Sequence, residues 1–306
     1  MIPLRDLNPA STRPVLIYAL IAINVLVFLG TAMDLNDAAR SLGAVAAHYT
    51  GGIEPSLIQT VREPLADGRF VEIQVGPEGY PLIPRESSWW TRTLTHMFVH
   101  GGIMHIAGNM LFLWVFGDNV EDRFGRGWFL LAYFGAGLVA LGTQIVSEPG
   151  SGIPMVGASG AVAGVLGAYL KLFPRAKVVG LVPLGFFFFI VTWSAAVFLG
   201  LWIGMQLLNV AAGGGGGVAW WAHIGGFGFG YVLAAILMAT GRVTAPMQFA
   251  SAPSRGGRGG GFGSGFGRGR IRSVGQRPSE GPFGTYGGTG RGKQKKITLR
   301  DLFRRY

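Results

Sequence analysis

The chain alternates between long apolar runs and polar connections, a pattern that indicates membrane-spanning helices. The first run, residues 15–33, has no charged residue and is long enough to cross the hydrocarbon at a rise of about 1.5 Å per residue. A secretory signal is the alternative, but the run exceeds the usual apolar core of about 7–15 residues, and no small-residue cleavage site follows it. Six spans are predicted: 15–33, 101–117, 127–146, 156–173, 188–209 and 218–240.

A long polar connection, residues 34–95, separates the first two predicted spans. Within it, residues 69–75 alternate between polar and apolar positions, which predicts a strand of a small hairpin. Its end, Trp89-Trp90-Thr-Arg92, combines indole rings with a guanidinium, as is typical of a membrane interface. We therefore expect part of this connection to lie at the bilayer surface.

Composition agrees with a membrane protein, because 49% of the 306 residues are hydrophobic, 13% are charged and the mean hydropathy is +0.40. The net charge of +11 comes from the C-terminal part of the chain. Residues 242–306 hold 14 of the 26 Lys and Arg residues and 2 of the 15 Asp and Glu residues, so the rest of the chain has a net charge of −1. This Gly-rich tail is predicted to be disordered. Its place beside a span favours anionic lipid as its partner over nucleic acid.

Basic residues also indicate the orientation, because Lys and Arg accumulate in cytoplasmic loops. The N-terminal segment 1–14 carries Arg5 and Arg13, whereas the connections 147–154 and 211–217 carry no basic residue. Both termini are therefore predicted to be cytoplasmic, around a membrane domain of residues 15–241 with residues 242–306 as a cytoplasmic tail. We expect a multi-pass protein of a bacterial plasma (inner) membrane, with the spans 101–117, 156–173 and 218–240 starting on the extracytoplasmic side.

Polar side chains within spans are energetically costly and are candidate functional residues. His105 and Asn109 are four residues apart and so share one helix face. Ser159 lies in the first turn of a predicted span, where unpaired amides and the helix dipole can stabilise an oxyanion. His223 lies near the start of the last span. The predicted topology places all four at a similar depth on the extracytoplasmic side.

Glycines favour close contact between the spans 156–173 and 218–240. Gly226 and Gly230 follow His223 on one helix face, and the other span offers Gly160 and further small residues. Such contact would bring the His223 imidazole to the Ser159 hydroxyl and form a Ser–His dyad. Two simpler interpretations stay open: small residues around Ser159 that serve packing alone, and a buried neutral His223 that is hydrogen-bonded to a carbonyl or a tryptophan. No Asp or Glu lies within a predicted span, so we expect packing and an aromatic neighbour such as Tyr169 to orient the imidazole.

His96, His100 and His105 also suggest a metal site, but the chain has no His-Glu-x-x-His motif and no cysteine. We expect His96 and His100 to form hydrogen bonds within their loop, and we predict no metal and no cofactor. The lack of cysteine also excludes disulfides and a cysteine nucleophile. A transporter is disfavoured because no repeat of broken helices is apparent.

Taken together, these segments resemble the rhomboid intramembrane serine proteases over roughly residues 89–240. The resemblance implies six helices around a water-filled cavity, with Ser159 as nucleophile and His223 as general base. It also implies that Asn109, His105 and the Ser159 amide bind the oxyanion. The motifs are Trp90-Thr-Arg92, His105-Ile-Ala-Gly-Asn109, Glu121-Asp-Arg-Phe-Gly125, Gly157-Ala-Ser159-Gly160 and Ala222-His223-Ile-Gly-Gly226-Phe-Gly-Phe-Gly230.

The expected fold is therefore an all-α polytopic membrane protein, a six-transmembrane-helix rhomboid-like bundle with a long first loop and a disordered tail. The implied function is an endopeptidase that cleaves single-span or polytopic membrane proteins near the extracytoplasmic ends of their spans. Substrates are expected to enter beside the span 188–209, under a cap formed by residues 213–217. The alternative is a non-catalytic membrane chaperone or scaffold that binds transmembrane helices, which would not need both Ser159 and His223. The tail and residues 69–80 lie outside the resemblance.

Overall fold

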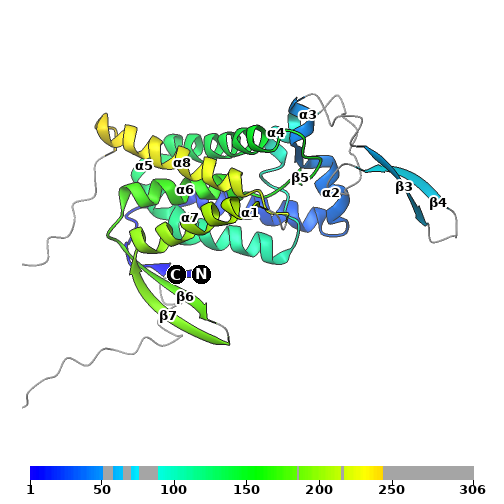
Figure 1. Cartoon of the computed structure of the whole chain (residues 1–306). Helices are drawn as coiled ribbons and strands as arrows, with labels where there is room; N and C mark the ends of the chain where they lie inside the picture. The colour runs from blue at the N-terminus through cyan, green and yellow to red at the C-terminus, as the bar shows by residue number, and fades with distance from the viewer. Residues whose placement is uncertain (51–57, 65–69, 76–88, 185, 215–216, 244–306) are drawn as a thin grey trace, which may run out of the picture. The chain divides into compact units, whose positions relative to one another are not determined.

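The computed structural model describes residues 1–50, 58–64, 70–75, 89–184, 186–214 and 217–243. Apolar helices form a bundle (Figure 1). Among the described helices, α5 and α8 are long and apolar enough to cross a membrane, and α1, α6 and α7 are shorter apolar helices. The bundle helices are α1 Val15–Thr31, α5 Ile103–Ser147, α6 Ser159–Leu172, α7 Ala195–Ala211 and α8 Trp220–Ala239.

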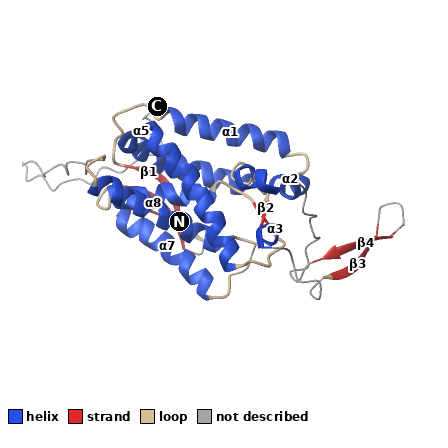
Figure 2. Cartoon of the chain, turned by 90° about the horizontal axis from the view of Figure 1, so that it is seen from above, coloured by secondary structure: helices blue, strands red, loops and turns tan. Residues whose placement is uncertain are grey.

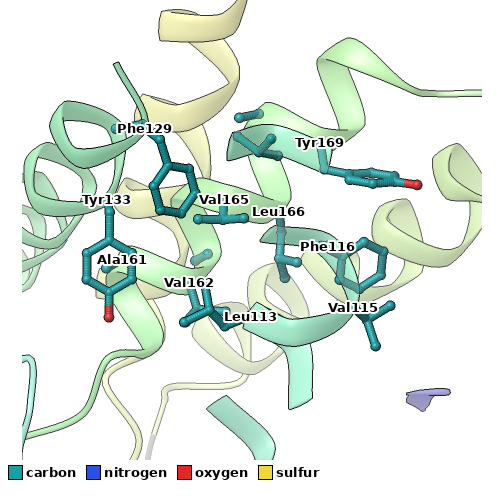
Figure 3. Close-up of a cluster of buried hydrophobic side chains, with 14 of the residues drawn as sticks. Leu113, Val115, Phe116, Phe129, Tyr133, Ala161, Val162, Val165, Leu166 and Tyr169 are labelled. Carbon is teal, nitrogen blue, oxygen red and sulfur yellow. The ribbon is translucent and has the colours of Figure 1, made fainter. Parts of the chain in front are cut away.

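Helix α6 is the central helix of the bundle, and every residue from Gly160 to Tyr169 is buried. It packs against both α5 and α8, because its small residues allow a close approach. Aromatic and aliphatic side chains of α5 fill the space beside it, and Figure 3 shows Phe116 next to Tyr169 in this core. The rings of these two residues meet edge to face at 4.9 Å between centroids.

Helix α5 contains the predicted spans 101–117 and 127–146 as two helical parts that meet at Gly125, whose φ of 71° and ψ of 163° are not helical. The predicted end at residue 117 was too early, because the helix continues through Glu121 and Phe124. The polar residues of this extra turn are accommodated by the N-terminal segment. Glu121 accepts hydrogen bonds from the amides of Leu16 and Ile17, each with an N–O distance of 3.1 Å.

The expectation of an all-α fold is wrong in detail, because strands accompany the helices. Strand β1, Ile2–Asp6, and strands β6, Lys177–Leu184, and β7, Phe187–Ser194, form an antiparallel sheet in the order β1-β6-β7. A second pair, β2, Ala44–Val45, with β5, Pro154–Met155, is also antiparallel.

The fifth span was predicted at 188–209, but residues 187–194 belong to β7 and α7 begins at Ala195. The β-branched and aromatic residues Phe189-Ile-Val-Thr-Trp193 favour a strand, and β6 offers a complete pairing partner from Lys177 to Leu184. Ser194 then starts the helix, because its hydroxyl accepts a hydrogen bond from the Val197 amide at 3.4 Å.

The long first loop is partly described. The predicted strand at 69–75 is confirmed as β4, Phe70–Val75, which pairs with β3, Gln59–Pro64. Besides β2, the described residues of the loop also form helices α2 Leu35–Leu42, α3 Ala46–Thr50 and α4 Arg92–Thr95, and a 3₁₀ turn, Trp89–Thr91. The predicted disorder of the tail concerns residues 244–306, which lie outside the described residues.

The bundle therefore has two distinct ends. The elements α2, α3 and β2 lie at one end, which we call the cavity end, and β1 lies at the other, the sheet end (Figures 1 and 2). At the sheet end, the Asp6 carboxylate is buried and accepts hydrogen bonds from the Tyr169 hydroxyl at 2.7 Å and from Asn119 Nδ2 at 2.8 Å. These contacts attach the N-terminal segment to both α5 and α6.

Candidate functional site

One cavity of about 550 Å³ opens at the cavity end and is lined by all four predicted polar residues. His105 and Asn109 come from the first turns of α5, Ser159 is the first residue of α6, and His223 lies in the first turn of α8. Gly217, the last glycine of the run, also lines it, together with Val218 and Ala219. Three helices far apart in the sequence thus contribute polar groups to a single space.

The backbone before Ser159 passes directly beside the two polar residues of α5. Gly157 has a φ of 117°, which other residues rarely adopt, and its amide donates to the His96 carbonyl at 2.8 Å. A Cβ at this position would lie 2.6 Å from His105 Nε2 and 3.6 Å from Asn109 Nδ2. Glycine is therefore required here, and the missing side chain lets this backbone approach both donors.

His96 and His100 hold this segment in place through the hydrogen bonds expected of them. His96 Nδ1 is 2.9 Å from the Arg92 carbonyl, and His100 Nδ1 is 3.2 Å from the Phe98 carbonyl. Because a ring nitrogen beside a carbonyl must carry the proton, Nε2 of His100 is the acceptor for the Ala158 amide at 3.4 Å. Burial lowers the pKa of each imidazole to about 4, so both are neutral at physiological pH.

The oxyanion candidates His105 and Asn109 both line the cavity. The Gly101 amide donates to His105 Nδ1 at 3.4 Å, so the proton of the neutral ring is on Nε2, the atom beside Gly157. Asn109 is buried, and within the described part of the chain its Nδ2 has no hydrogen-bond partner. A buried donor without a partner is costly unless a ligand oxygen satisfies it.

His223 is oriented by a residue that the sequence analysis missed. Its Nδ1 is 2.9 Å from Gln206 Oε1 on α7, and the amide orientation is set because Gln206 Nε2 donates to the Trp202 carbonyl at 3.0 Å. An amide oxygen only accepts, so Nδ1 carries the proton and Nε2 is left as a basic nitrogen. The rings of Trp202 and Trp220 flank the imidazole at 5.9 and 6.1 Å.

The expectation that Tyr169 orients His223 is therefore wrong. Tyr169 lies ten residues after Ser159 on α6, and its hydroxyl bonds to Asp6 at the sheet end. A signal for Gln206 was present, because it is a polar residue within an apolar run and so a functional candidate. Its partner could not be read from the sequence, because that depends on how α7 crosses α8.

The predicted close contact between α6 and α8 through their glycines is confirmed. A Cβ at Gly226 would fall on the Gly160 carbonyl oxygen, and one at Gly230 on the Gly164 carbonyl oxygen. Helices α6 and α8 are thus in backbone contact at the turns that carry the two side chains. Within the described residues no hydrogen bond joins the hydroxyl to the imidazole, although both line the same cavity.

The remaining motif residues lie outside this cavity. Arg92 is 2% exposed at the start of α4, and its carbonyl accepts the His96 hydrogen bonds, whereas Trp90 is 64% exposed. Glu121 is buried and caps the start of α1 at the sheet end. Within the described residues, no group of three His, Asp or Glu residues is placed to hold a metal ion.

These features define a helical membrane protein with a cavity among its apolar helices that is lined by four polar side chains from three of them. The family model of the rhomboid domain matches residues 86–240, half of the chain, and the chain belongs to the rhomboid family.

Similar proteins include the Rhomboid protease GluP of Bacillus subtilis, 34% identical over 152 residues, which are 50% of this chain and 27% of that protein. The Putative rhomboid protease YdcA of Bacillus subtilis is 36% identical over 92 residues, 30% of this chain and 45% of that protein. RHOMBOID-like protein 4 of Arabidopsis thaliana is 30% identical over 232 residues, 74% of this chain and 54% of that protein. The chain thus matches about half or less of the length of these relatives.

Proposed function

We propose that the chain is an intramembrane serine endopeptidase that hydrolyses peptide bonds in or near transmembrane segments of other membrane proteins. The observation that carries the proposal is the cavity itself, which is lined by Ser159, His223 and Asn109 from three helices. The buried Nδ2 of Asn109 has no hydrogen-bond partner among the described residues. Membership of the rhomboid family and the two relatives named as rhomboid proteases support the same reaction class.

In the proposed mechanism, Ser159 Oγ attacks the carbonyl carbon of the scissile peptide while His223 Nε2 takes the hydroxyl proton. The proton then passes to the leaving amine, and an acyl-enzyme remains. A water molecule attacks the acyl carbon with the same imidazole as base, which releases the carboxylic acid and restores the hydroxyl. Gln206 acts as a positioning residue, because its amide oxygen holds the proton on His223 Nδ1 and keeps Nε2 free.

The charge that develops on the carbonyl oxygen is stabilised by donors that are already in place. His105 Nε2–H and Asn109 Nδ2–H lie beside Gly157, and the Ser159 amide is among the first-turn amides of α6 without an intrahelical partner. A substrate oxyanion would satisfy the Asn109 donor, which has no other partner among the described residues.

We further propose six spans with both termini in the cytoplasm, and a bacterial plasma membrane as the location. The N-terminal segment, the break in α5 and the connection after α6 all carry basic residues, and contacts bring the three together at the sheet end. Asn8 Nδ2 donates to Asn119 at 2.9 Å, β1 pairs with β6, and Arg123 lies over the Phe173 ring at 6.0 Å. A cytoplasmic sheet end places the cavity toward the extracytoplasmic side.

The test uses purified protein, a model single-span substrate and a fluorophosphonate probe. We expect wild type to cleave the substrate and to be labelled, and Ser159→Ala to do neither. Ser151→Ala is the matched control, because Ser151 also lines the cavity and its hydroxyl accepts only from the Ile153 amide among the described bonds. Equal cleavage by wild type and Ser159→Ala removes the protease assignment. Substrate binding by wild type without any cleavage favours the scaffold alternative instead.

A further inference from the structure

The hairpin of β6 and β7 has a buried base and an exposed tip. At the base, the Leu7 amide donates to the Lys177 carbonyl at 2.7 Å, and Val178 and Val179 are fully buried. Strand β1 pairs with β6 only as far as Leu181, while β7 pairs along the whole of β6. The part of the hairpin beyond Leu181 therefore extends past the support of the N-terminal strand.

This tip is apolar on both faces, which is unusual for a hairpin in water. From Val178 to Val191 the sequence contains no polar or charged side chain. Phe186 is 99% exposed and Phe187 is 71% exposed, and Phe188, Phe189 and Ile190 are at least half exposed. An exposed apolar patch of this kind marks a protein or membrane interaction site.

The surroundings of the hairpin indicate that its partner is the lipid bilayer. Its base continues directly into α6 and α7, two apolar helices of a membrane protein, and the tip leaves their ends obliquely beside the bundle (Figure 1). Lys171, Arg175 and Lys177 precede the tip and Trp193 follows it, and both residue types are enriched at membrane interfaces. These residues would lie at the membrane interface, and the apolar tip next to them would then reach the lipid.

Two features limit how deeply the hairpin can enter the bilayer: the length of its strands and the open edge of its sheet. Each strand has eight residues, fewer than the roughly 9–11 that a spanning strand needs. Strand β7 is also an edge of its sheet, and an open edge is not tolerated in the hydrocarbon core. We propose that residues 186–190 insert shallowly into the headgroup–acyl boundary and anchor the sheet end to the membrane. This inference does not depend on the proposed catalysis.

The test is a quenching experiment, made simple because the chain has no cysteine. Single cysteines replace Phe187 or Ile190 and carry an environment-sensitive nitrobenzoxadiazole label in vesicles of phosphatidylcholine and phosphatidylglycerol. Arg126→Cys is the aqueous control, because Arg126 is exposed next to the break in α5. Leu208→Cys is the lipid control, because this α7 side chain is 70% exposed on the apolar helix. Quenchers are spin-labelled lipid and iodide, with iodide present on both sides of the membrane.

We expect both tip labels to be quenched by the spin-labelled lipid as the Leu208 label is, and to be protected from iodide. In the Phe187→Cys background, Phe188→Ser together with Phe189→Ser should reduce the lipid quenching at least twofold without lowering the melting temperature. Quenching of the tip by iodide, as at Arg126, overturns the proposal. Protection from both quenchers also overturns it, because the tip is then covered by protein, such as a second copy paired along β7.

Discussion

The two ends of the bundle are built from the same helices, α5 and α6, but the polar side chains at the two ends differ in their hydrogen bonding. Asn109 and Asn119 are ten residues apart on α5, and Ser159 and Tyr169 are ten residues apart on α6, a separation of about 15 Å in each case. At the sheet end, Asn119 and Tyr169 both donate to the Asp6 carboxylate. At the cavity end, Asn109 Nδ2 has no partner among the described residues.

This difference separates polar groups that stabilise the fold from a polar group that the proposed function assigns to the substrate. A buried polar atom without a partner lowers stability, and Asn109, which carries such an atom, also lines the cavity. The satisfied cluster at Asp6 instead attaches the N-terminal segment to α5 and α6. Burial alone would not distinguish the two asparagines, because Asn109 is 7% and Asn119 is 2% exposed. Their hydrogen bonds do distinguish them.

The largest expected effect tests this contrast directly. Asn109→Ala should lower kcat on a single-span substrate about 100- to 1000-fold, because it removes the proposed oxyanion donor. Its melting temperature should stay near that of wild type, since no bond made by Nδ2 is lost. Asn119→Ala is the matched variant on the same helix, and it should lose stability but keep its kcat. The contrast fails if both variants lose stability and activity in parallel.

Acid should lower the stability of the folded protein through His96 and His100, which lie near the cavity end. Burial lowers the pKa of each to about 4 from an ordinary value of 6.5, so below about pH 6.5 the unfolded chain binds protons that the folded chain does not. Each histidine then costs up to about 3 kcal/mol of stability between pH 6.5 and 4, and contributes no pH dependence above that window. Thermal unfolding of wild type and His100→Asn across this range should show a shallower decline in the variant. An identical decline would contradict the prediction.

A moderate loss of stability is expected at the sheet end. Tyr169→Phe removes the hydroxyl that donates to Asp6 and should lower the free energy of unfolding by about 1–3 kcal/mol. The kcat of the folded protein on the single-span substrate should not change under the proposed function, because this hydroxyl is remote from the cavity. Tyr231→Phe on the exposed surface of α8 is the control and should be neutral. A large drop in kcat for Tyr169→Phe would instead restore its predicted role beside His223.

The smallest expected effect concerns Gln206. Gln206→Leu should lower kcat about 5- to 10-fold with little change in KM, because it removes one neutral hydrogen bond that orients His223, the proposed base. Gln206→Glu keeps an acceptor oxygen and should retain more activity than Gln206→Leu. Asn209→Ala, on the same helix, serves as the control, because the Asn209 side chain bonds only to the Met205 carbonyl among the described contacts. Equal kcat for Gln206→Leu and wild type would exclude the positioning role.

Much of the helical framework was predictable because each span carries its own signal. The predicted spans 15–33, 156–173 and 218–240 correspond to α1, α6 and α8 within a few residues at each end. The start of the fifth helix could not be predicted in the same way, because residues 187–194 are apolar enough for a helix but form a strand that pairs with β6. Apolar character alone does not distinguish a buried or lipid-exposed strand from a helix.

By itself the sequence determined the apolar helices, the polar residues that they carry and the glycines that allow α6 and α8 to touch, since these depend on local composition and spacing. Only the tertiary structure decided that Gln206 rather than Tyr169 meets His223. It alone also showed that, within the described part of the chain, Asn109 Nδ2 has no hydrogen-bond partner whereas Asn119 Nδ2 donates to Asp6. It also decided that four phenylalanines project from a hairpin. These outcomes depend on how distant segments cross and pair, and such long-range contacts leave no periodic trace along the chain.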